Sequence, residues 1–69
     1  MSVRIDRVIL ATEMVRREWR YKHLCELSGV SRATMSAITG GKTVAPSTAQ
    51  SVADALGVPL ERLIEAKEA

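Results

Sequence analysis

The side chains able to do chemistry are few in this sequence, and their spacing argues against catalysis and metal binding. Cys25 is the one cysteine and His23 the one histidine, which leaves a zinc site short of ligands. The run Gly40-Gly41-Lys42-Thr43 lacks the full spacing of a phosphate-cradling P-loop, and serine and acidic residues occur without a nucleophile motif. We therefore expect no enzyme, no metal, no cofactor and no small-molecule ligand.

Basic side chains are the more informative group because they are unevenly distributed. The net charge is +2, yet residues 1–42 carry eight basic residues against four acidic ones, whereas residues 43–69 carry two against four. The eight are Arg4, Arg7, Arg16, Arg17, Arg20, Lys22, Arg32 and Lys42. A polyanionic partner should therefore meet the first part of the chain. Taken singly, Arg16, Arg17 and Arg20 are better explained as solvated surface charge.

The length and composition describe one small folded domain, residues 1–69. Of these residues 46% are hydrophobic and 26% charged, and with one Trp, one Tyr and no Phe the core must be mainly aliphatic. No apolar stretch approaches the roughly 20 residues that span a bilayer, and the first residues lack the apolar segment of a signal peptide. A lone cysteine suits a reducing compartment, so we expect a cytoplasmic protein.

Hydrophobic periodicity predicts short helices and no sheet. A first helix is expected over Val3 to Arg17, a stretch without Gly or Pro, and a second over Tyr21 to Ser28, with Leu24 and Leu27 on one face. The apolar residues of the first helix spread wider than one stripe. They are Ile5, Val8, Ile9, Leu10, Met14 and Val15. Packing on two sides within the core is the favoured explanation, and contact with a second subunit is the alternative.

A turn at Ser28, Gly29 and Val30 should separate the second helix from a third. Gly29 can adopt the positive φ that ends a helix, and Ser31 can cap the next one through its hydroxyl. That third helix is predicted to end at Thr39, before two glycines.

Proline and glycine delimit the last two predicted helices. Pro46 suits the first turn of a fourth helix, which ends at Gly57. Its apolar positions are Ala49, Val52, Ala53 and Leu56. Pro59 opens a last helix, expected over Leu60 to Ala66, with Leu60, Leu63 and Ile64 on its apolar side.

Four residues in the middle of the chain have the spacing of a helix-turn-helix. Two helices that cross at roughly 90–120° need a small side chain where they touch, a glycine-like turn, and apolar residues on the second helix that face the first. Cys25, Gly29, Met35 and Ile38 occupy these places in order.

The stretch from Leu24 to Ile38, LCELSGVSRATMSAI, resembles the phage repressor and Cro-like (lambda repressor-like, XRE-type) helix-turn-helix family. Gly41-Lys42 and the segment Val52 to Leu63 are similar to that family's exit from the third helix and its last two helices, so the resemblance runs from Trp19 to Leu63. It implies an all-α, compact, five-helix DNA-binding domain whose recognition helix, about Arg32 to Thr39, enters the major groove of double-stranded DNA.

Two positions depart from the family pattern. Arg20-Tyr21 stands where the family usually has Thr-Gln, so the expected cap of the second helix and a familiar glutamine contact to DNA are missing. Glu18 stands where a glycine often ends the first helix. Arg20 and the Tyr21 hydroxyl are expected to reach phosphate instead.

The resemblance also implies which residues touch DNA. Family members place the positions that match Arg32, Ala33, Ser36 and Ala37 against base edges, where Arg can donate two hydrogen bonds to guanine and an alanine methyl can touch the thymine methyl. Phosphate contacts are expected from side chains, from a helix N-terminus and from backbone N–H groups around the two glycines. The residues concerned are Arg20, Tyr21, Lys22, Ser31, Thr34, Thr39, Gly40, Gly41, Lys42 and Thr43.

Several notable residues have simpler structural explanations. Trp19 is expected to pack between the first two helices, and Cys25 to be a small core residue rather than a redox switch. His23 is expected to be exposed, and Met14 and Met35 to fill the core.

These observations predict a repressor-like or Cro-like transcriptional regulator from a bacterium, phage or mobile element, acting on operator DNA in the nucleoid. A homodimer is expected to use the last helix or the spare apolar surface of the first helix, because no oligomerisation domain follows in this sequence. The alternative is a protein-interaction module with the same fold, such as an antitoxin or anti-repressor component.

Overall fold

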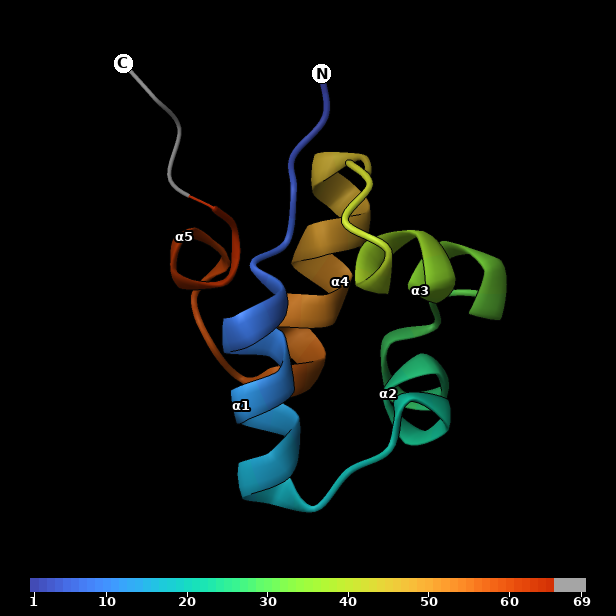
Figure 1. The fold of residues 1–69 in the computed structure, drawn as a ribbon, viewed down its shortest axis with the longest axis vertical. Coiled ribbons are helices and arrows are strands. Elements are labelled where there is room, and N and C mark those ends of the chain that lie inside the picture. The colour runs from blue at the N-terminus through green and yellow to red at the C-terminus, as the bar shows by residue number, and fades with distance from the viewer. Residues whose placement is uncertain (66–69) are drawn as a thin grey trace.

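The computed structural model describes residues 1–65, which form five α-helices and no strands (Figure 1). The helices are α1 (Arg7–Arg17), α2 (Tyr21–Ser28), α3 (Arg32–Thr39), α4 (Pro46–Leu56) and α5 (Leu60–Leu63). The all-α prediction is therefore confirmed, and the bounds of α2, α3 and α4 agree with those expected from their caps and breakers.

The first helix begins at Arg7, so the prediction that it starts at Val3 is wrong. Asp6 is the N-cap, and its Oδ1 accepts hydrogen bonds from the backbone N–H groups of Val8 (2.9 Å) and Ile9 (3.1 Å). A short side-chain acceptor at this position satisfies N–H groups that have no partner inside the helix. The aspartate thus fixes the start of α1 and leaves the preceding residues extended.

Those preceding residues, Val3–Asp6, form a segment that we call the strap. Val3 exchanges two backbone hydrogen bonds of 2.8 Å with Val44, in the loop after α3. Ile5 lies opposite Ile64, after α5, in a second antiparallel pair whose hydrogen bonds run from Asp6 N–H to the Leu63 carbonyl (2.8 Å) and from Glu65 N–H to the Arg4 carbonyl (2.9 Å), and the Ile5 side chain is buried. The strap therefore connects the exit of α3 to the exit of α5.

The last helix is shorter than predicted. α5 ends at Leu63, and Ile64 is already extended (φ −88°, ψ 155°) because it pairs with the strap. Ala66, the expected end of this helix, lies outside the described residues.

Buried aliphatic side chains from every helix and from the strap form one core around α4. They are Ile5, Leu10, Met14, Leu24, Met35, Ile38, Val44, Ala49, Val52, Ala53, Leu56 and Leu63. Trp19 is half-buried and packs against this cluster, as expected, and Met14 and Met35 are core residues. Leu27 was expected to share the buried face of Leu24, but it is 51% exposed.

The prediction that the first helix is packed on two sides is also wrong, because Val8 is 75% and Val15 74% exposed. Leu10 and Met14 supply the buried face of α1, and the two valines lie on the opposite side. The helix therefore presents an apolar stripe to solvent.

A buried carboxylate joins α1 to α4 and α5. Glu13 is 3% exposed and forms ion pairs with Arg17 (2.6 Å), Arg16 (3.4 Å) and Arg62 (3.9 Å). Arg17 also donates a hydrogen bond to the carbonyl of Leu56 at the end of α4 (2.6 Å). Arg17 is therefore a structural residue rather than solvated charge. The hydrogen bond from Arg17 is the main reason that the pKa of Glu13 lies below its ordinary value.

Candidate nucleic-acid interface

The turn between α2 and α3 has the geometry that its residues predict. Gly29 has φ +77°, a left-handed conformation that costs glycine little, and its N–H donates to the carbonyl of Cys25. Met35 and Ile38, 3% and 1% exposed, face inward from α3. Cys25 is half-buried rather than fully buried, because one side of it opens onto the surface between the two helices.

The outer face of α3 carries the residues that were predicted to recognise bases. Arg32, Ala33 and Ser36 are exposed, and Ala37 is half-buried at the edge of this face. None of the ion pairs within residues 1–65 involves Arg32. Its guanidinium can therefore meet a ligand without first breaking a salt bridge.

A hollow of about 300 Å³ lies between the start of α2 and the outer face of α3. It brings Tyr21 and Lys22 of α2 together with Arg32, Ser36 and Thr39 of α3. Residues that were assigned separately to phosphate and to bases thus line one continuous surface.

The N-terminus of α2 has the properties of an anion-binding site. Arg20 is its N-cap and makes no side-chain capping hydrogen bond. Within residues 1–65 the backbone N–H groups of Tyr21 and Lys22 have no hydrogen-bond acceptor, and both side chains are exposed. Unsatisfied N–H groups and the helix dipole at this end favour a phosphate.

The exit of α3 differs from what the sequence suggested. The N–H groups of Gly40, Gly41 and Lys42 donate to the carbonyls of Ser36 (2.9 Å), Ile38 (3.1 Å) and Ala37 (2.9 Å). These three N–H groups would have to give up hydrogen bonds within the chain to bind phosphate, so this turn does not support the expected backbone contacts around the glycines. The side chains of Lys42 and Thr43 remain exposed.

The three hydroxyl residues of α3 and its cap that were assigned to phosphate, Ser31, Thr34 and Thr39, differ in their freedom to donate. The Ser31 hydroxyl accepts from the N–H of Thr34 (3.1 Å) and donates to the Thr34 hydroxyl (3.0 Å), so Ser31 caps α3 as predicted. Thr39 donates its hydroxyl to the carbonyl of Ser36 (3.1 Å). Thr34 is thus the member of this group whose own hydroxyl proton is left to donate outward.

Two arginines beside this surface were not assigned to it from the sequence. Nε of Arg4 donates to the carbonyl of Gly41 (2.9 Å), and Arg7 lies against the same glycine with a long hydrogen bond to the carbonyl of Thr39 (3.5 Å). The alternation of Val3 and Ile5 with polar neighbours was the available signal for an extended segment. The predicted helix over these residues concealed it.

Other kinds of site find no support within the described residues. Across residues 1–65, no group of three His, Cys, Asp or Glu side chains is placed to hold a metal ion. No helix of that part of the chain has the length and apolar character needed to cross a bilayer.

Two short helices at a tight glycine turn, with an exposed polar face on the second, define a helix-turn-helix domain. A family model of the Cro/C1-type HTH DNA-binding domain matches residues 10–69, so the chain belongs to this family of DNA-binding domains. Such domains are typically not enzymes. Neither a curated protein nor a solved structure matches the chain.

Proposed function

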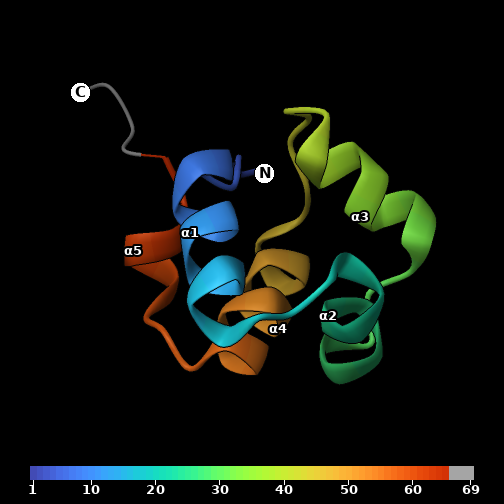
Figure 2. The ribbon, with the colours of Figure 1, turned by 60° about the horizontal axis from the view of Figure 1, so that its bottom comes forward.

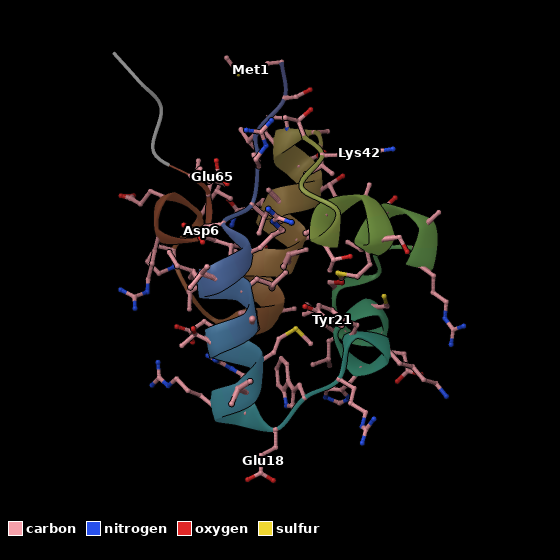
Figure 3. The ribbon with its side chains drawn as sticks, viewed as in Figure 1. Met1, Asp6, Glu18, Tyr21, Lys42 and Glu65 are labelled. Carbon is pink, nitrogen blue, oxygen red and sulfur yellow. The ribbon has the colours of Figure 1, made fainter. Side chains whose placement is uncertain are left out.

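We propose that this protein is a sequence-specific regulator of transcription, repressor-like or Cro-like, which inserts α3 into the major groove of operator DNA in the nucleoid. The observation that carries the proposal is the position of α3 between two groups suited to phosphate. Figure 3 places Tyr21, at the start of α2, on one side of α3 and Lys42 on the other. A helix held in this way can enter the groove while each flanking group meets a strand.

Direct base recognition falls to the exposed face of α3. Arg32 is the side chain best suited to specificity, because a guanidinium can donate two parallel hydrogen bonds to guanine O6 and N7. Ser36, one turn further on, can donate to or accept from either kind of base. The methyl groups of Ala33 and Ala37 add no bulk and can touch a thymine methyl.

Phosphate contacts would set the position of α3 rather than the sequence that it reads. On one side they come from Arg20, Tyr21, Lys22 and the N–H groups that open α2. On the other they come from Lys42 and Thr43. Thr34 is suited to donate to a phosphate near the start of α3, whereas Ser31 and Thr39 would first have to give up hydrogen bonds within the chain.

Dimerisation on a two-fold operator would use the stripe on α1. Val8, Ala11 and Val15 are exposed at helical spacing, and Ala11 and Val15 also line an apolar hollow of about 330 Å³ beside Trp19. A second copy in antiparallel orientation would set its Val8 beside Val15 of the first. By contrast, Leu60 and Ile64 already pack against the core, so the α5 end has less apolar surface to offer.

The area of this stripe suggests a weak dimer. Two valines and the rim of a hollow provide much less than the roughly 800 Å² per partner of a stable interface. The two copies would therefore associate mainly when adjacent half-sites, about 34 Å apart, raise their local concentration.

Selection of bound fragments from a random duplex library tests the proposal. The expected result is a palindromic motif with half-sites one helical turn apart, bound with an affinity that falls steeply as salt rises. A flat salt dependence on duplex DNA together with no enriched motif would overturn it and favour a protein-interaction module.

A further inference from the structure

The Lys42 side of α3 holds more positive charge than the helix-turn-helix itself supplies. Arg4 of the strap and Arg7 at the start of α1 are both exposed and both lie against Gly41, the residue that precedes Lys42. Their guanidiniums approach the carbonyls of Gly41 and Thr39, at distances of 2.9 and 3.5 Å. Three cationic residues, Arg4, Arg7 and Lys42, therefore meet where α3 ends.

The placement of these arginines is fixed by backbone pairing rather than by chance contact of long side chains. The two hydrogen bonds between Val3 and Val44 hold the strap along the loop that follows α3. Asp6 then starts α1, which brings Arg7 back over the same loop. The hydrogen bonds to carbonyls use few of the five N–H donors that each guanidinium has, so most remain available to a ligand.

The dimensions of α3 match those of the groove that it would enter. An α-helix with its side chains is about 10–12 Å across, and the major groove is roughly 12 Å wide. With α3 in the groove, the start of α2 would lie near one bordering strand and the cluster of Arg4, Arg7 and Lys42 near the other. The cluster also offsets the partial negative charge at the C-terminus of α3, which would otherwise repel phosphate.

We propose that Arg4 and Arg7 bind phosphates of the strand on the Lys42 side of α3, so that the strap is part of the DNA-binding surface. This inference rests on the proposed function. Glu65 lies 3.7 Å from Arg4, but both side chains are about half exposed and an ion pair of this kind is weak in water. A DNA phosphate can therefore displace Glu65 from Arg4.

The salt dependence of binding to a short mixed-sequence duplex tests this inference. Each phosphate neutralised adds about 0.9 to the slope of log affinity against log salt, so Arg4→Gln/Arg7→Gln should lower the slope by about 1.8. Between about 50 and 200 mM salt, the double variant should then lose about 12-fold less affinity than the unaltered protein. Arg4→Lys/Arg7→Lys should keep the slope, because it keeps both charges.

Arg62→Gln is the matched control, since it removes the same charge from α5. In both ribbon views α5 lies on the far side of α1 from α2 and α3 (Figures 1 and 2). Arg62 should therefore not meet a phosphate of DNA bound at α3, and its removal should not change the slope. Circular dichroism tests whether each variant is folded. If the double variant is unfolded, Arg4→Gln alone replaces it in the experiment, and it should lower the slope by about 0.9.

The outcomes separate this inference from the proposed function. A steep slope for the unaltered protein, lowered by Lys42→Gln but not by Arg4→Gln/Arg7→Gln, would refute the role of the strap and leave DNA binding by the helix-turn-helix intact. A slope near zero for the unaltered protein would refute both. A purely structural role for the two arginines predicts weaker binding with an unchanged slope, which also counts against the inference.

Discussion

Glu18 gives a prediction whose size can be worked out from its backbone. It ends α1 with φ +57° and ψ +38°, and it is the one residue other than glycine with positive φ among residues 1–65. A side chain in this left-handed conformation costs about 1–2 kcal/mol, and glycine avoids that cost. Glycine also raises the conformational entropy of the unfolded chain, which reduces the gain in stability by about 0.4–1 kcal/mol.

Glu18→Gly should therefore stabilise the domain by roughly 0.5–1 kcal/mol, which raises the melting temperature by about 2–8 °C in a chain of this size. Glu18→Ala is the matched control because it removes the same carboxylate but keeps the strained conformation. Removing a negative charge from a helix C-terminus is itself favourable by a few tenths of a kcal/mol or more, and the control isolates that contribution. If thermal unfolding gives Glu18→Gly a melting temperature no higher than that of Glu18→Ala, the left-handed backbone at this residue does not cost the folded state stability.

Three further predictions concern recognition, acid stability and dimerisation. Arg32→Ala should cost about 1–3 kcal/mol on the selected operator and relax the choice of one base pair; equal losses on operator and random DNA would refute base recognition. The Glu13 carboxylate has a lowered pKa in the folded state, so its stabilising effect is present above its ordinary pKa of 4.5 and is lost as the pH falls through the lower folded value. The melting temperature should therefore drop below about pH 4.5, less steeply in Glu13→Gln, and an identical pH profile for that variant would contradict the assignment. Val8→Gln/Val15→Gln should weaken binding to a palindromic site but not to a single half-site, whereas equal effects on both probes would exclude the α1 stripe as the dimer surface.

The features that the sequence predicted correctly depend on residues close together in the chain. Gly29 and Ser31 end one helix and cap the next through hydrogen bonds to residues three or four positions away. Met35 and Ile38 turn one face of α3 inward, which leaves Arg32 on the other. The helix-turn-helix and the bounds of α3, the proposed recognition helix, could therefore be located from local chemistry alone.

The features that the sequence did not predict depend on residues far apart in the chain. The strap is extended because Val3 pairs with Val44 and Ile5 with Ile64, and neither partner can be inferred from two alternating apolar residues. The contact of Arg4 with Gly41 follows from that pairing and was missed with it. The backbone hydrogen bonds at the end of α3 could not be predicted either. Two glycines in a sequence do not reveal whether their N–H groups are free or donate within the chain.

The shortness of α3 links its proposed role in base recognition to the stability of the whole domain. A helix of eight residues is far below the roughly 12–15 at which isolated helices become even marginally stable, so α3 depends on the burial of Met35 and Ile38. A substitution in that buried pair therefore acts on DNA binding through the fraction of folded molecules, and it lowers affinity for every sequence by the same factor. A substitution on the exposed face changes the preference among sequences and leaves the folded fraction almost unaltered. Under the proposed function, stability and selectivity can thus be changed independently from two sides of one short helix, which is the physical basis for proposing that Arg32 recognises bases rather than stabilises the fold.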